Sequence, residues 1–168
     1  MEEQIMNMPA VALRGLTILP GMIAHFDISR ERSLRAVEEA MEQDQKIYLV
    51  TQRNVDSEDP TQEDLYQMGI VADIKQVVRL QNDVVRILVD GISRAALLGF
   101  TGNEKYLEAE ICYCDSNADS LPEDLREAML LGVREAFHRY AAVIGKISKE
   151  LIRQICLLYT SPSPRDRQ

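Results

Sequence analysis

The sequence predicts an α+β protein: a small pseudo-barrel of antiparallel strands with one packed helix, followed by the first helices of an α-helical bundle. Three observations support this prediction. Apolar and polar residues alternate between residues 68 and 100, which is the period of a half-buried strand. One amphipathic helical pattern interrupts the strand patterns at residues 30–43, and a second, longer one follows residue 120.

The composition indicates a globular chain with protein or peptide partners. The 168 residues are 46% hydrophobic and 27% charged, which is typical of a folded domain. A net charge of −8 repels phosphate backbones and argues against nucleic-acid binding. No apolar run reaches the roughly 18 residues of a membrane span, and the start of the chain lacks a signal peptide. We therefore expect a cytoplasmic protein without a membrane partner.

Two strands and a helix are predicted in the first quarter of the chain. We expect strands over residues 8–13 and 22–28, because short apolar runs are separated there by Gly and Pro turn residues. Ser29 is predicted to cap a helix over residues 30–43. This helix has an apolar face for packing on the barrel, made up of Leu34, Val37, Ala40 and Met41.

The remaining strands of the barrel follow an exposed acidic loop at residues 54–63. A compact strand is expected before the loop, at residues 46–52. After it, alternation predicts a strand with Ile70, Ala72 and Ile74 on one face. Asn82 and Asp83 form a turn to the next strand. Gly91 is expected to separate that strand from another over residues 93–100, and the last strand covers residues 106–113.

A polar break near residues 115–120 predicts a domain boundary. The barrel domain would then cover residues 8–115, and the opening helices of an α-helical region would cover residues 120–155. The first helix carries an apolar stripe and ends at Gly145. Ser148 is expected to begin a second helix.

Residues 156–168 (CLLYTSPSPRDRQ) differ in composition from the preceding helices. They resemble the translated read-through of a sequencing adaptor, so we expect a non-native tail. A natural disordered terminus is the alternative. Under either interpretation the informative sequence ends near Ile155, in an unfinished helix.

Several segments occur in the order and spacing found in the N-terminal, substrate-recognition domain of the ATP-dependent Lon proteases. The chain resembles this domain over about residues 8–155. The segments are PAVALRG at 9–15, LPGM at 19–22, residues 29–33 with the following helix, residues 46–52, DLYQMGIVA at 64–72 and VDGISRA at 89–95. The resemblance implies a barrel like that of pseudouridine-synthase-associated (PUA) domains, followed by the helices. It also implies capture of unfolded, damaged or tagged proteins and assembly with other Lon subunits.

No catalytic residue, metal ligand or cofactor is expected in this chain. The Lon ATPase needs a phosphate loop, and the G-x-x-x-x-G-K-[ST] pattern is absent from the sequence. The resemblance assigns ATP, Mg²⁺ and the Ser-Lys dyad of the serine protease to other domains. Cys112 and Cys114 are too few for a zinc site, and His25 and His138 are isolated in the sequence.

The candidate substrate-binding residues lie in the loop before the second predicted strand and in the first turns of the helix at residues 30–43. They are Leu19, Pro20, Arg30, Glu31, Arg32 and Arg35. The competing interpretation is an ordinary solvated helix face. Exposed apolar side chains on the barrel would suit unfolded substrates better, because such substrates share exposed hydrophobic segments and no fixed sequence.

Two other functions are open at this point. One is a stand-alone Lon-type substrate-binding domain protein with no attached enzyme. The other is an RNA-binding PUA-type module, which the net charge, the low aromatic content and the lack of a basic stripe disfavour.

Overall fold

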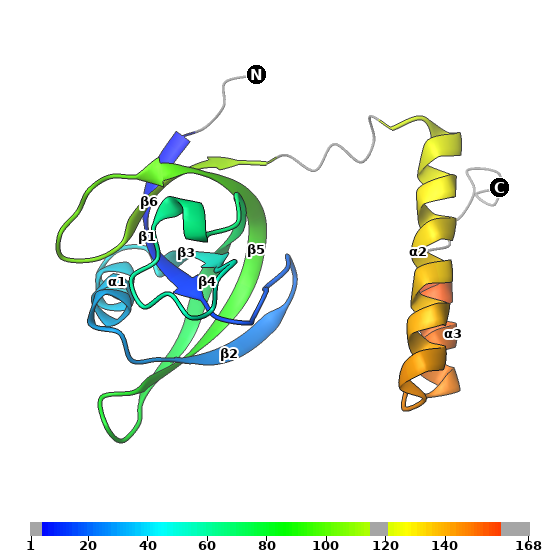
Figure 1. Cartoon of the computed structure of the whole chain (residues 1–168), viewed down its shortest axis with the longest axis horizontal. Coiled ribbons are helices and arrows are strands. Elements are labelled where there is room, and N and C mark those ends of the chain that lie inside the picture. Colours follow the sequence, from blue (N-terminus) through cyan, green and yellow to red (C-terminus); the bar gives the residue numbers. More distant parts are fainter. Residues whose placement is uncertain (1–4, 115–120, 159–168) are drawn as a thin grey trace. The chain divides into compact units, whose positions relative to one another are not determined.

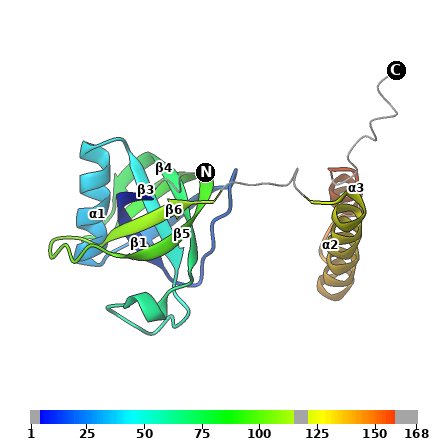
Figure 2. The same ribbon diagram turned by 90° about the horizontal axis from the view of Figure 1, so that it is seen from above.

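The computed structural model describes residues 5–114 and 121–158. Contacts divide the chain into two compact units, Met1–Asp115 and Ser116–Gln168. The first unit holds the strands, helix α1 (Glu31–Glu42) and a single 3₁₀ turn, η1 (Gln62–Asp64); the second holds two helices (Figures 1 and 2). The predicted α+β fold is confirmed.

Six strands form a sheet that closes into a barrel (Figure 1). They are β1 (Ile5–Leu13), β2 (Ile23–Ile28), β3 (Lys46–Thr51), β4 (Met68–Arg79), β5 (Val85–Phe100) and β6 (Glu108–Tyr113). The strand order is β2-β5-β4-β3-β1-β6, and an additional β5–β6 pairing closes the ring. Closure depends on the length of β5, because its first part pairs with β2 and its last part pairs with β6.

The expectation of an all-antiparallel barrel is wrong for one pair of strands. β1 and β3 run parallel, from Ala10 opposite Tyr48 to Leu13 opposite Thr51. The connection between them contains β2 and α1, which is the long crossover that parallel pairing requires. Pro9 lies one residue before this parallel pairing and faces only β6. Its missing N–H is therefore tolerated at a position with one neighbouring strand.

The prediction that Gly91 separates two strands is also wrong, because β5 continues through it. Val71 pairs with Ser93 and Ala72 pairs with Gly91, so Ile92 is an extra residue that forms a bulge. A Cβ atom at Gly91 would lie 2.4 Å from the carbonyl oxygen of Leu19. Glycine therefore permits a close crossing of two chain segments. The predicted turn before β5 is confirmed by the positive φ angles of 59° at Asn82 and 58° at Asp83.

Alternate residues of the central strands belong to two hydrophobic clusters, as the period of a strand requires. Ile70, Ala72 and Ile74 contribute to the cluster that contains the buried side of α1, whereas Val71 contributes to the second cluster. The middle of β3 and the first half of β4 are thus buried on both faces. In Figures 1 and 2, α1 lies beside the barrel, and it packs on β1 and β3.

Helix α1 begins differently from the prediction. Arg30 is the N-cap residue and no side chain caps the helix, so the expected cap by Ser29 is wrong. The buried face consists of Ser33, Ala36, Val37 and Ala40, which recur at helical spacing. Met41 is 38% exposed, because it follows Ala40 by one residue and is rotated about 100° from that face.

The second unit contains α2 (Glu123–Ile144) and α3 (Lys149–Leu158). Gly145 ends α2 with φ 65°, and the Ser148 hydroxyl accepts a hydrogen bond from the N–H of Leu151 at 3.2 Å, as predicted. α3 continues three residues beyond the predicted end at Ile155 and so enters the predicted tail; residues 159–168 of that tail lie outside the described part. None of the described helices is long and apolar enough to cross a membrane.

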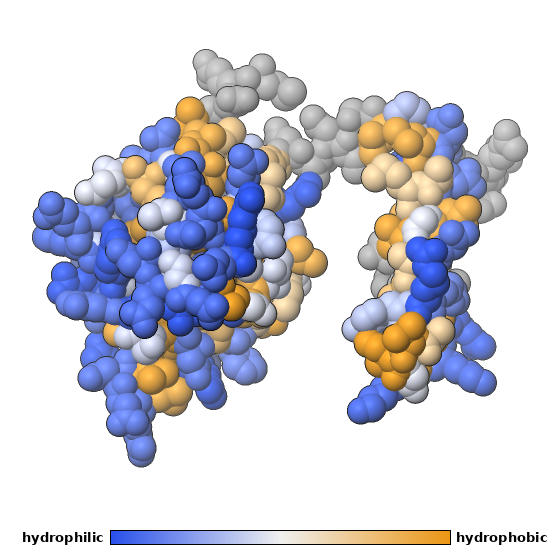
Figure 3. Space-filling model, in the orientation of Figure 1, coloured by the Kyte–Doolittle hydropathy of each residue, from blue (hydrophilic) through white to orange (hydrophobic). Residues whose placement is uncertain are grey.

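Most apolar side chains of α2 are exposed. Only Ala141 is buried within this helix, and Figure 3 shows apolar side chains gathered on its visible face. Seven large ones have exposed fractions between 40% and 87%: Leu125, Met129, Leu131, Val133, Tyr140, Val143 and Ile144.

Candidate functional site

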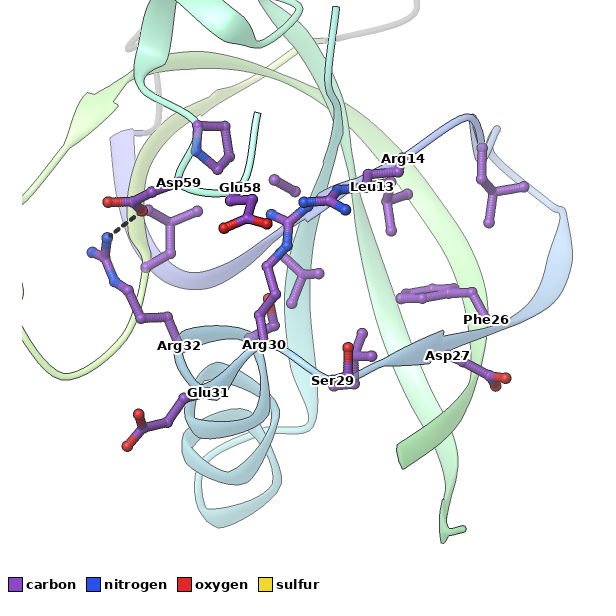
Figure 4. Close-up of a pocket in the computed structure, with 17 residues that line it drawn as sticks. Leu13, Arg14, Phe26, Asp27, Ser29, Arg30, Glu31, Arg32, Glu58 and Asp59 are labelled. Atoms are coloured by element: carbon purple, nitrogen blue, oxygen red, sulfur yellow. Dashed lines mark hydrogen bonds and ion pairs between the residues drawn. The ribbon is translucent and has the colours of Figure 1, made fainter. Parts of the chain in front are cut away.

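A cavity of about 650 Å³ opens where the ends of β1 and β2, the start of α1 and the loop after β3 meet (Figure 4). Its apolar lining includes Leu13, Leu16 and Phe26. Its charged lining includes three arginines and four carboxylates: Arg14, Arg30, Arg32, Asp27, Glu31, Glu58 and Asp59. The volume falls within the usual range of small-ligand pockets.

Gln52 holds two of the segments that form this cavity through hydrogen bonds. Its side chain is only 3% exposed, and its Oε1 atom accepts a hydrogen bond from Arg30 Nη2 at 2.7 Å. Its Nε2 atom donates to the carbonyl oxygens of Asn54 and Ser57, both at 3.0 Å. Because a buried amide is costly to leave without partners, Gln52 fixes both the Arg30 side chain and the loop that faces it.

Two further arginines hold the same loop, Arg14 from the segment after β1 and Arg32 from α1. Arg14 Nη2 donates to the carbonyl oxygen of Ser57 at 3.1 Å. Arg32 pairs with Asp59 at 3.2 Å and also donates to the Asn103 carbonyl oxygen at 3.4 Å. The Arg32–Asp59 pair is exposed, so it adds little to stability. Its main effect is to set the position of the loop.

The electrostatics of the cavity favour an anion beside Arg30. Burial lowers the pKa of the Arg30 guanidinium, and the positive charge of Arg14 lowers it further. Asp59 and Glu58 act in the opposite direction. Two like charges thus share one partly buried wall, where an added negative charge would relieve their repulsion.

The six residues selected from the sequence occupy different places. Arg30, Glu31 and Arg32 line the cavity. Arg35 is not among the lining residues and forms an ion pair with Glu31 along α1. Leu19 and Pro20 also lie outside the cavity lining, in the loop that crosses β5 at Gly91.

Sequence reasoning missed the residues that complete the cavity. Arg14, Phe26, Glu58 and Asp59 come from three different segments. One signal was available, since the acidic loop after β3 has the opposite charge to the arginines at the start of α1. Opposite charge alone does not predict that the loop contacts the helix, because many exposed loops are acidic.

A separate apolar surface surrounds Gly91, and we name it the Gly91 patch: Leu19, Met22, Ile23 and Ile92. Their exposed fractions are 58%, 37%, 67% and 46%. The backbone brings them together. Ile23 pairs with Asp90 in the β2–β5 ladder, the N–H of Gly91 donates to the Met22 carbonyl oxygen at 2.9 Å, and the N–H of Met22 donates to the Leu19 carbonyl oxygen at 3.1 Å.

A family model described as the ATP-dependent protease La (LON) substrate-binding domain matches residues 7–162. The chain belongs to this family. The Lon protease of Lachnoclostridium phytofermentans is 38% identical over 155 residues, which are 92% of this chain and 19% of the relative. Lon protease 1 of Bacillus subtilis is 32% identical over 149 residues, 89% of this chain and 19% of the relative. This chain of the Lon substrate-binding family thus spans about a fifth of the length of these relatives.

Solved structures of Lon N-terminal domains share this fold. The N-terminal domain of the Mycobacterium avium complex Lon protease superposes with a TM-score of 0.68 at 16% identity, covering 92% of this chain and 77% of that one. The Lon N-terminal domain protein from Xanthomonas campestris gives 0.55 at 16% identity, covering 95% and 92%. The family and the substrate-binding class predicted from the sequence are confirmed. The matched family is the substrate-binding domain of Lon and includes neither its ATPase nor its protease domain.

The part of the chain that the structure describes contains no cluster of possible metal ligands. Within residues 5–114 and 121–158, no group of three or more His, Cys, Asp or Glu side chains could hold a metal ion. Cys112 lies in β6, and Cys114 follows the end of that strand. Cys114 Sγ lies 3.8 Å from Met68 Sδ.

Proposed function

We propose that this domain captures unfolded or damaged polypeptides for an ATP-dependent Lon protease in the cytoplasm and contacts other Lon subunits. The family match supports this role. ATP, Mg²⁺ and peptide-bond cleavage belong, in this proposal, to the ATPase and protease domains of Lon. The observation that carries the proposal is the Gly91 patch on the barrel surface.

The Gly91 patch suits unfolded chains because its chemistry is apolar and sequence-tolerant. Each of its four side chains is more than a third exposed, although the barrel buries most of its other aliphatic residues. Covering such side chains stabilises a complex by about 25 cal/mol per Å² of apolar surface removed from water. A folded protein buries the segments that would cover them, whereas an unfolded protein exposes them.

Binding of fluorescein-labelled, chemically unfolded casein, followed by fluorescence anisotropy, tests this proposal. Ile23→Ser removes the most exposed apolar side chain of the Gly91 patch and should weaken binding about three- to tenfold. Leu98→Ser is the matched control, because Leu98 is also exposed on β5 (43%) but lies six residues, roughly 20 Å of strand, beyond Ile92. Equal affinities for the wild type and Ile23→Ser would refute the role of this surface.

A further inference from the structure

We propose that the cavity between α1 and the loop after β3 is a subsite for a carboxylate that a bound polypeptide carries next to an apolar side chain. This inference rests on the proposed function and adds a substrate preference to it. The ligand could present either the carboxylate of its chain end or that of an Asp or Glu side chain. Both have the same chemistry, and the experiment below distinguishes them.

The cationic side of the subsite is Arg14 and Arg30. Gln52, which is almost completely buried, holds Arg30 through a 2.7 Å hydrogen bond, so this guanidinium is positioned before any ligand arrives. Preorganised donors bind a ligand more tightly, because they lose less side-chain freedom on binding. Guanidinium groups also match the planar geometry of a carboxylate.

Glu58 is the internal group that such a ligand would displace. Three of the four carboxylates that line the cavity have cationic partners: Asp59 pairs with Arg32, Asp27 with Arg86 and Glu31 with Arg35. Among the described residues, Glu58 has no ion pair within 4 Å, yet its charge acts on Arg30. Figure 4 shows its side chain directed towards the guanidinium groups of Arg14 and Arg30. Glu58 therefore competes for them without being fixed.

The other walls select the rest of the ligand. Leu13, Leu16 and Phe26 form an apolar surface inside the cavity, which favours a hydrophobic side chain beside the carboxylate. Glu58 and Asp59 add two carboxylates to the same lining. Each repels an anionic ligand, so the ligand's charge must be met by the arginines.

Three short fluorescein-labelled peptides of glycine and serine test the subsite by anisotropy. The first ends in leucine with a free carboxylate, the second is its C-terminal amide, and the third is an amide with aspartate before the leucine. We expect the amide without aspartate to bind about tenfold more weakly than the better of the two acidic peptides. The order of the two acidic peptides shows whether the chain end or an acidic side chain is preferred.

Two variants should change peptide affinity in opposite directions, which a merely structural role of these residues would not produce. Glu58→Gln removes the competing charge and should tighten binding of the acidic peptides about two- to fivefold, whereas Arg14→Gln should weaken it. Glu63→Gln removes an equal charge from an exposed residue in η1, outside the cavity lining, and should leave peptide affinity unchanged.

Two results would overturn the subsite. One is equal binding of the acidic and amide peptides, with no effect of Glu58→Gln. The other is displacement of the peptide by inorganic phosphate more strongly than by acetate at equal ionic strength, which would identify a phosphate site. Neither result affects casein binding at the Gly91 patch, so failure of the subsite and failure of the proposed function are distinguishable.

Discussion

Neighbouring side chains on β5 have opposite environments. Ile87 is completely buried in the hydrophobic cluster that also contains the buried side of α1, whereas Arg86 is exposed and binds Asp27 through two hydrogen bonds of 2.7 and 2.9 Å. Ile87→Ala should lower the free energy of unfolding by about 2–5 kcal/mol, because it leaves a cavity in the core. Arg86→Ala should lower it much less. Urea melts of both variants measure the difference, and a loss for Arg86→Ala as large as that for Ile87→Ala would contradict the assignment of these two side chains to opposite faces of β5.

Gly69 is packed closely against its neighbours in the barrel. A Cβ atom at this position would lie 2.5 Å from Tyr48 Cζ and 2.6 Å from the carbonyl oxygen of Leu49. Tyr48 cannot easily move, since it is fully buried and its hydroxyl donates to the Ala95 carbonyl oxygen at 3.1 Å. Gly69→Ala should therefore destabilise the protein by about 1–3 kcal/mol or more in urea melts.

A matched glycine in α2 provides the control for Gly69. No atom lies within 4 Å of a Cβ placed at Gly132, and alanine has the higher helix propensity. Gly132→Ala should thus be neutral or stabilising for α2, as measured by helical circular dichroism. Destabilisation by both alanines, or by neither, would show that steric contact at Tyr48 does not decide the result.

Some residues of the cavity could be predicted from the sequence and others could not. The charged start of α1 was predictable, because a helix pattern places its polar residues on the surface. Arg14 and Glu58 were not predictable, since they are far from Arg30 in the sequence and meet it only through the β1–β3 pairing and the hydrogen bonds of Gln52. A buried glutamine just after the end of a strand gives no periodic signal.

At the scale of elements, β3 and β4 share a cross-strand ion pair that makes stability depend on pH. Lys46 faces Asp73 in the register, with Nζ 3.0 Å from Oδ1, and Lys75 lies 3.3 Å from the other carboxylate oxygen. The hydrogen bond from Lys46 lowers the pKa of Asp73, partly offset by burial, and Lys75 lowers it further. A lowered carboxyl pKa stabilises the fold above the unfolded value of about 3.9, and this stabilisation is lost as the pH falls below it.

Asp73→Asn should accordingly reduce stability at pH 7, and its difference from wild type should shrink as the pH falls below about 3.9, where the wild type loses the stabilisation that the ionised carboxylate provides. Asp83→Asn is the control. It removes a charge in the turn before β5, where φ is 58° and asparagine is well tolerated. A loss for Asp73→Asn that is as large at pH 3 as at pH 7 would assign the effect to packing and exclude the ion pair as its cause.

The order and type of most elements were predictable, because alternating and helical periodicities are local properties of the sequence. The parallel β1–β3 pair was not, since direction depends on the path of the crossover between the strands. The continuity of β5 was missed for a related reason. A glycine that follows an aspartate suggests a break, but β4 pairs on both sides of the Ile92 bulge and keeps the strand intact.

At the scale of the whole molecule, the division into Met1–Asp115 and Ser116–Gln168 predicts that the barrel is stable without the helices. The barrel has two hydrophobic clusters, both made from residues before residue 115, whereas α2 buries only Ala141. A chain of residues 1–115 should therefore keep its urea midpoint, with the free energy of unfolding within about 0.5 kcal/mol of the full chain.

The isolated helical unit, residues 116–168, should behave in the opposite way. α2 has 22 residues, but short helices depend on tertiary packing for most of their stability, and its large apolar side chains are mainly exposed. Its helical circular dichroism should thus be weak in dilute solution and should rise with concentration, as apolar faces associate. Sedimentation velocity over the same range provides the second measurement. A loss of barrel stability in the 1–115 chain, together with a monomeric and fully helical 116–168 chain, would contradict the independence of the barrel.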